Sequence, residues 1–115
     1  MRRKIGVVEL AGKTLTLWLS FTPKFGTRVV FGVPVESTER KAAEKIKDRV
    51  DVKRGNANAV RTYYMEGKKF FCFRPRDIVL VPEFRITANL EEVLAKFYAA
   101  EFWRGCGDRV QHKGA

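Results

Sequence analysis

The chain has 115 residues, of which 45% are hydrophobic, so it can bury one core and is too apolar to be a disordered chain. Its formal charge of +10 at pH 7 favours a polyanionic partner, and nucleic acid is the commonest large polyanion. Residues 1–76 carry 18 basic and seven acidic side chains, whereas residues 77–115 carry five and six. The basic surface is therefore expected in the first two thirds of the chain.

Nothing in the sequence indicates a membrane segment, a disulfide framework or a metal site. Cys72 and Cys106 do not have the spacing of metal ligands. Residues 1–4 begin like a secretory signal, but Glu9 and Lys13 interrupt any apolar run, and no stretch approaches the ~20 apolar residues that cross a bilayer. We therefore expect a cytoplasmic protein with no cofactor and no membrane contact. The abundance of Lys, Arg and Glu, with a single Gln and a single His, is typical of thermophilic proteins.

The first part of the chain predicts three strands, at residues 4–9, 14–21 and 28–35. In the second strand Leu residues alternate with polar residues, so Trp18 lies on the polar face among small hydroxyl side chains. The loop between the second and third strands carries Lys24 and Phe25.

A charged helix follows these strands. Ser37 or Thr38 can cap it, and its narrow apolar stripe predicts an end near Val50. Its basic residues form either a solvated face or a second ridge that faces phosphates. Residues 51–58 are expected to form a loop with Lys53 and Arg54 at its basic tip.

Residues 59–66 and 69–74 predict a hairpin that contains the most unusual stretch of the chain. Residues 68–76 read Lys-Lys-Phe-Phe-Cys-Phe-Arg-Pro-Arg, with three phenylalanines between pairs of basic residues. Such a run is either a fully buried strand or a strip that stacks on nucleic-acid bases. A register slip of one residue would exchange Phe71 and Phe73 for Phe70 and Cys72. We expect Phe71 and Phe73 to face outward.

The last third of the chain predicts a short apolar run at residues 77–81, either a sixth strand or a buried connector, and then a helix. Asn89 and Glu92 fit a capping box at the start of this helix. Its apolar surface from Leu90 to Trp103 is wide enough to predict burial on more than one side or a homodimer contact. Residues 1–107 are expected to form one domain, and residues 108–115 a disordered tail.

The order of these elements, β-β-β-α-β-β-(β)-α, predicts an α+β fold in which about five antiparallel strands carry two helices on one face. The other face would be half-open and would bear aromatic rings edged with cations. The residues expected to stack on bases are Trp18, Phe25, Tyr63, Phe71 and Phe73. The residues expected to contact phosphates are Lys24, Arg28, Lys53, Arg54, Arg61, Lys68, Lys69, Arg74 and Arg76. This pattern favours a single-stranded DNA or RNA partner, with DNA preferred.

Signals for catalysis are few, and we expect no catalytic or metal-binding residues. The only histidine, His112, lies in the predicted tail. Asp51 followed by Glu66-Gly67-Lys68 is similar to the carboxylate pattern of metal-dependent nucleases, although Glu66 falls in a predicted turn. Two alternatives to a single-strand-binding protein therefore stay open. One is a small metal-dependent nuclease, and the other is an RNA-associated structural protein whose rings are all buried.

The phenylalanine strip between Lys68-Lys69 and Arg74/Arg76, together with the thermophile-like composition, resembles the ThermoDBP family of archaeal single-stranded DNA-binding proteins. The resemblance covers residues from about 59 to 76. It implies an aromatic cleft with basic edges, binding of single strands without sequence preference, and self-association through helical segments.

Overall fold

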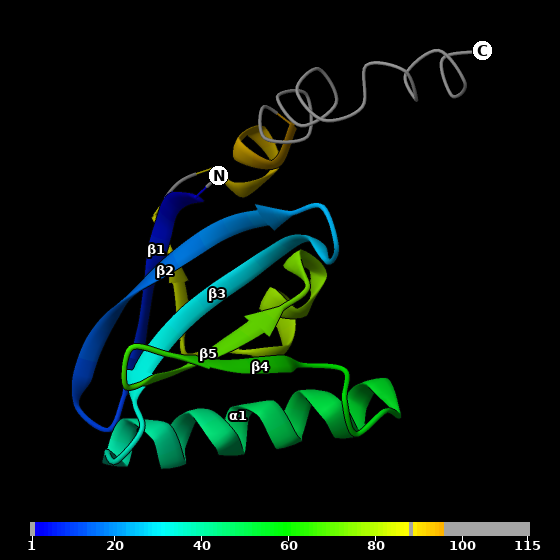
Figure 1. The fold of residues 1–115 in the computed structure, drawn as a ribbon. Helices are drawn as coiled ribbons and strands as arrows, with labels where there is room; N and C mark the ends of the chain where they lie inside the picture. Colours follow the sequence, from blue (N-terminus) through cyan, green and yellow to red (C-terminus); the bar gives the residue numbers. More distant parts are fainter. Residues whose placement is uncertain (1, 88, 96–115) are drawn as a thin grey trace.

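The computed structural model describes residues 2–87 and 89–95, which form a six-stranded sheet with a long helix against one face (Figure 1). The sheet order is β4-β5-β3-β2-β1-β6, and every neighbouring pair is antiparallel. The strands are β1 (Arg2–Leu10), β2 (Lys13–Thr22), β3 (Gly26–Pro34), β4 (Arg61–Met65), β5 (Lys68–Phe73) and β6 (Phe84–Ile86). The helices are α1 (Thr38–Arg54), the 3-10 helix η1 (Pro75–Leu80), and a helix that is described over residues 90–95. The predicted α+β class is confirmed, with one strand more than expected.

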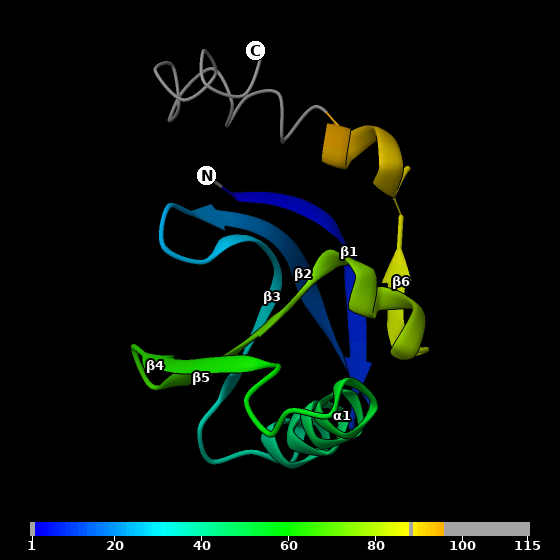
Figure 2. The ribbon, with the colours of Figure 1, turned by 90° about the vertical axis from the view of Figure 1, so that its right-hand side faces the viewer.

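The core lies between α1 and one face of the sheet, which we call the covered face. Figure 2 shows α1 nearly end-on, with the β4–β5 hairpin and β6 on opposite sides of it. The apolar stripe of α1 packs here against alternate residues of β1, β2, β3 and β5. Fully buried members of this core include Leu17, Leu19, Val29, Phe31, Val33, Val50, Phe71 and Phe73. Side chains alternate between the two faces along β2, β3, β4 and β5, so every second residue points away from α1. We call this second side of the sheet the open face.

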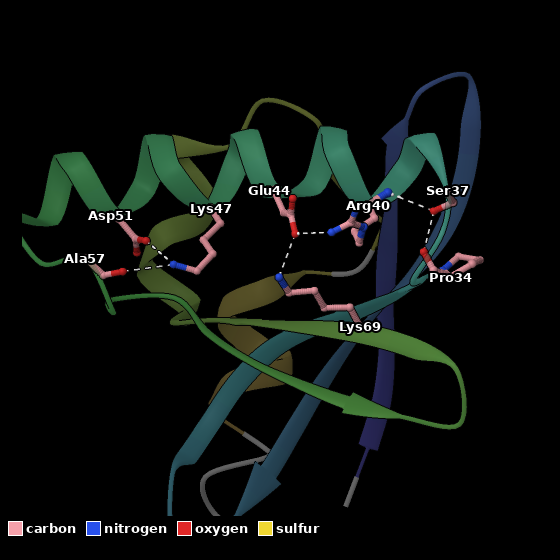
Figure 3. Close-up of polar contacts among 8 residues, drawn as sticks. All are labelled: Pro34, Ser37, Arg40, Glu44, Lys47, Asp51, Ala57 and Lys69. Atoms are coloured by element: carbon pink, nitrogen blue, oxygen red, sulfur yellow. Dashed lines mark hydrogen bonds and ion pairs between the residues drawn. The ribbon is translucent and has the colours of Figure 1, made fainter.

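Helix α1 is longer than predicted, because it continues past Val50 to Arg54. Ser37 caps its start by accepting a hydrogen bond from the Arg40 N–H at 3.1 Å. Near its end Asp51 is buried and pairs with Lys47 (Figure 3). Asp51 also accepts a hydrogen bond from the Val60 N–H at 2.9 Å. These contacts join α1 to the start of β4. Gly55, with φ of 70°, then ends the helix.

Lys53 and Arg54 therefore lie in the last turn of α1, and the prediction of a basic loop tip is wrong. Arg54 forms an ion pair with Asp77 of η1, with 2.9 Å between Nη1 and Oδ1. The other carboxylate oxygen of Asp77 accepts a hydrogen bond from the Arg74 N–H at 3.0 Å. Because the Asp77 side chain is only 1% exposed, this pair holds the end of α1 against η1.

The short apolar run predicted at residues 77–81 belongs to η1 and the residue after it, and the sixth strand is formed by Phe84–Ile86 instead. Strand β6 pairs with β1 at the sheet edge farthest from β4. It lies close to β1 at Gly6, where a Cβ atom would stand 2.1 Å from the Arg85 carbonyl oxygen. Gly6 therefore permits this pairing.

Asn89 caps the last described helix, because its Oδ1 accepts a hydrogen bond from the Glu92 N–H at 3.2 Å. Val93 is buried and Leu90 and Leu94 pack beside it on the core. The remainder of the predicted apolar helix surface, the proposed dimer contact that depends on it and the predicted tail lie outside the described residues. Within residues 2–87 and 89–95, no helix is long and apolar enough to span a membrane.

The buried Arg54–Asp77 pair generates a stability prediction. Asp77→Ala should lower the free energy of unfolding by about 2–4 kcal/mol, because it removes two hydrogen bonds and leaves the half-buried Arg54 without its carboxylate. Urea denaturation followed by circular dichroism measures this difference. The matched control is Asp48→Ala, which removes an exposed carboxylate of α1 and should change stability by less than ~0.5 kcal/mol. Equal effects of the two changes would contradict the prediction.

Candidate nucleic-acid interface

The pairing of β5 with β3 decides which phenylalanine rings face outward. Phe71 lies opposite Phe31 and Phe73 lies opposite Val29, and both rings are 0% exposed on the covered face. Their centroids are 5.5 and 5.9 Å from that of Phe31. The prediction that Phe71 and Phe73 face outward is therefore wrong, because these two rings complete the core cluster around Phe31. Side chains alternate along a strand, so Phe70 and Cys72 lie on the open face instead.

Phe70 stacks on Tyr63 of the neighbouring strand β4, with 5.0 Å between ring centroids and 9° between ring planes. The ring has room because its partner on β3 is Gly32, which has no side chain. A Cβ atom at Gly32 would lie 2.5 Å from Cε1 of Phe70. Gly32 is thus a positioning residue that sequence reasoning missed, although a glycine inside a strand is a known sign of close approach.

Trp18 lies on the open face of β2, as its polar neighbours predicted, and the Arg2 guanidinium sits 4.5 Å from its ring centroid. Arg2 also acts on Tyr63. Burial raises the pKa of Tyr63, the neighbouring Cys72 acts in the same direction, and Arg2 opposes them. Arg2 therefore lies within electrostatic range of both rings.

Phe25 lies in the β2–β3 turn, which folds it toward β4. Its N–H donates to Thr22 Oγ1 at 3.2 Å, and Gly26 adopts a φ of 73° that favours glycine. The Arg61 guanidinium lies 4.5 Å from the Phe25 ring centroid, and Lys24 Nζ lies 5.3 Å from it. The turn and β4 thus meet through a cation–π contact, although β5 lies between β3 and β4 in the sheet.

We call this set of rings and cations the open-face surface. Its aromatic members are Trp18, Phe25, Tyr63 and Phe70, and its basic members are Arg2, Lys24, Arg28 and Arg61. It includes three of the five predicted stacking residues and three of the nine predicted phosphate contacts.

A pocket of about 270 Å³ opens within the open-face surface, between the β2–β3 turn and β4. Strands β3 and β5 supply Val30 and Cys72, which are register partners. The other lining residues are Ser20, Thr22, Phe25, Gly26, Arg28, Arg61, Thr62 and Tyr63. Burial raises the pKa of the Cys72 thiol to about 11, so the group is neutral at pH 7 and is not an activated nucleophile.

The basic side chains of the open-face surface have no carboxylate partners within the described part of the chain. The ion pairs found there are Arg40–Glu44, Lys47–Asp51, Arg49–Glu83, Arg54–Asp77, Lys69–Glu44 and Arg85–Glu9. None of them includes a basic residue of the open-face surface. Arg28 instead donates from Nη1 to the Thr27 carbonyl at 2.9 Å, which fixes its guanidinium.

Lys69 is a predicted phosphate contact that the structure places elsewhere. It is on the covered face, where its Nζ lies 2.9 Å from Glu44 Oε2 of α1 and its side chain is 13% exposed (Figure 3). The hydrogen bond between them lowers the pKa of Glu44 and raises the pKa of Lys69. Lys69 thus joins β5 to α1. It faces α1 because it is two residues before Phe71 on β5, so both side chains point to the covered face.

Five other predicted phosphate contacts are not members of the open-face surface. Lys53 and Arg54 are on α1. Lys68 shares the open face with Phe70 by alternation, but it is at the far end of β5, next to the β4–β5 turn. Arg74 and Arg76 follow β5 and line a groove that also contains Arg28. The basic surface therefore continues from Arg28 around the end of the sheet.

Asp51 and Glu66, the carboxylates considered for a nuclease site, do not come together. Asp51 is buried beside Val60 before β4 begins, whereas Glu66 lies in the turn after β4, with φ of 53°. Six residues of extended chain separate Val60 from Glu66, roughly 20 Å at ~3.4 Å per residue. Among residues 2–87 and 89–95 no group of three His, Cys, Asp or Glu side chains could hold a metal ion.

Comparisons of the chain with protein-family models, with curated proteins and with solved structures found no match. A function for this surface must therefore be inferred from its geometry and charge.

The close approach at Gly32 generates a double-mutant prediction. Gly32→Ala should destabilise the protein by about 1–2 kcal/mol, because its methyl group must push Phe70 off its stack with Tyr63. When Phe70 is already alanine, the same change should be neutral or stabilising, since alanine is favoured over glycine in a strand by ~0.5–1 kcal/mol. Denaturant unfolding of the wild type, both single variants and the double variant gives the coupling energy. A coupling energy near zero would show that Gly32 does not position Phe70.

Proposed function

We propose that the chain is a non-enzymatic protein that binds single-stranded nucleic acid, with DNA favoured, on the open-face surface. The observation that carries this proposal is that four aromatic rings share one sheet face with four cations that have no carboxylate partner among residues 2–87 and 89–95. A cytoplasmic location belongs to the same proposal.

The rings supply the affinity for bases. Base stacking on an aromatic side chain contributes ~1–3 kcal/mol per base and tolerates any sequence, because every base has a π face. Tyr63 and Trp18 lie on strands that are three strand spacings apart, roughly 14 Å at ~4.8 Å per spacing. A strand that crosses the sheet could therefore stack successive bases on separate rings. Duplex bases are already stacked on one another and offer no free faces to these rings.

The cations supply phosphate contacts along the same path. Arg2, Lys24 and Arg61 lie beside the rings, and Arg28 leads toward Arg74 and Arg76 at the end of the sheet. Each phosphate contact releases a condensed counterion, so affinity should fall steeply as the salt concentration rises.

The resemblance to the ThermoDBP family implies the same class of function. It was based on Phe70, Phe71 and Phe73, and only Phe70 lies on the open face. The proposal therefore depends on the arrangement of the open-face surface and not on the resemblance.

Adjacent tyrosines of β4 test the stacking role. Tyr63 and Tyr64 are 44% and 63% exposed, but Tyr63 belongs to the open face and Tyr64 lies beside Lys69 on the covered side. Tyr63→Ala should weaken binding of a labelled 15-nucleotide oligo-dT by roughly 5- to 150-fold, the loss of one stacked base. Tyr64→Ala should leave the affinity within about twofold. Fluorescence anisotropy measures both, and equal losses would contradict binding on the open face.

A matched pair of charge deletions tests the phosphate role. Arg61→Ala and Lys45→Ala each remove one exposed positive charge, the first from the open-face surface and the second from α1. Arg61→Ala should reduce the slope of log affinity against log salt by about one, whereas Lys45→Ala should leave that slope unchanged. The titrations use the same oligo-dT between ~50 and 300 mM salt. If the affinity of the wild-type protein for oligo-dT does not change with salt concentration, the proposed function is refuted.

A further inference from the structure

The pocket of the open-face surface has a construction that a stacking platform alone does not need. Phe25 reaches from the β2–β3 turn to the Arg61 guanidinium of β4 and closes one side of it. Val30 and Cys72 lie side by side on β3 and β5, the two strands that it crosses. The result is a recess with aromatic side chains at its edges and small apolar residues from the middle of the sheet.

Two guanidinium groups flank this recess from different strands. Arg28 of β3 is held by its hydrogen bond to the Thr27 carbonyl, and Arg61 of β4 is held over the Phe25 ring. Both lie close enough to the Cys72 thiol to oppose the rise in its pKa that burial causes. A guanidinium that stacks on a ring keeps its in-plane N–H groups free for hydrogen bonds. The recess therefore presents fixed hydrogen-bond donors, and its described lining residues include no carboxylate.

The size of the recess limits what can enter it. Sites for drug-sized ligands span ~300–1,000 Å³. At about 270 Å³ this pocket lies just below that range, so it suits one flat ring system and not a length of polymer. Phe25 and Tyr63 provide ring contacts for such a group, as the other aromatic residues of the surface do for stacked bases.

We propose that this pocket takes one guanine base out of the bound strand, with the guanidinium groups of Arg28 and Arg61 donating hydrogen bonds to its O6 and N7 atoms. The proposal rests on the proposed function, and it adds one base-specific contact to a surface that otherwise ignores sequence. Guanine presents two adjacent acceptors, which match the arginine fork. Adenine sets an amino donor beside N7, and thymine offers only isolated carbonyl acceptors. Unpaired cytosine has N3 and O2 as adjacent acceptors, so the strand with dC is the critical competitor in the test.

The test compares four 15-nucleotide strands that are oligo-dT except for the central base, which is dG, dA, dC or dT. Each competes against the same labelled oligo-dT at constant salt, so phosphate contacts are equal in all four. The strand with dG should bind at least ~5-fold more tightly than each of the others, the discrimination expected of one good bidentate contact.

Variants assign this preference to the pocket. Arg28→Lys and Arg61→Lys keep the positive charge and lose the planar fork, so the ratio of dG to dT affinity should fall toward one in each. Any general loss of phosphate affinity cancels in that ratio. Cys72→Leu should also abolish the ratio, because the larger side chain fills the recess. Lys45→Ala on α1 is the control and should keep the ratio of the wild-type protein.

Each outcome decides between the two claims. Equal affinities for the four strands, tightest binding of another base, or a dG preference that survives both lysine variants would overturn the guanine pocket. In all three cases salt-dependent binding of oligo-dT would still support the proposed function. Absence of oligo-dT binding at low salt would refute the proposed function and the guanine pocket together.

Discussion

The pairing of Phe71 with Phe31 is the interaction on which the arrangement of the open face depends. The two rings are 5.5 Å apart and fully buried, and Phe73 joins the same cluster. Burial of a phenylalanine side chain is worth ~1.5–3 kcal/mol, so a one-residue slip that exposed two of them would be strongly unfavourable. The same pairing sets Phe70 opposite Gly32 and against Tyr63. The core therefore determines which rings are left for a ligand.

Basic side chains on the covered side of the sheet form ion pairs, whereas those of the open-face surface form none among the described residues, and the position of α1 explains this difference. The helix and its neighbours supply carboxylates that pair with basic residues on the covered side, as Glu44 does with Lys69 and Asp77 with Arg54. On the open face the guanidinium groups of Arg2 and Arg61 instead lie over rings. Cations within a Debye length of ~8–10 Å reinforce one another, so a group of them without ion-pair partners in the described part of the chain concentrates the positive potential on this side.

Sequence patterns predicted those features that are decided locally. Alternation with hydroxyl residues placed Trp18 correctly, and the capping residues Ser37 and Asn89 begin their helices as expected. The strip at β5 could not be resolved in this way, because Phe70 and Cys72 are as apolar as Phe71 and Phe73. Its orientation depends on Phe31 and Gly32, about 40 residues earlier in the chain.

The same limit applies to the basic residues. Arg54 and Lys69 are indistinguishable from surface cations in the sequence, since their carboxylate partners are 23 and 25 residues away. The predicted end of α1 near Val50 is wrong for a local reason, because Gly55 is the residue that ends the helix. For Arg54 and Lys69, in contrast, a long-range partner decided what the local pattern left open.

Arg61 connects the two ligand-binding roles inferred for the open face. In the structure its guanidinium covers the Phe25 ring, a contact worth ~0.5–1 kcal/mol at an exposed site. A guanidinium that stacks on a ring keeps its in-plane N–H groups free, so Arg61 can donate hydrogen bonds to a phosphate or to a base edge without leaving Phe25. A hydrogen bond to a charged group contributes ~1.5–3 kcal/mol, and it does not compete with the cation–π contact because the two use different parts of the guanidinium. The Phe25 ring thus holds Arg61 at a position from which it can serve both roles.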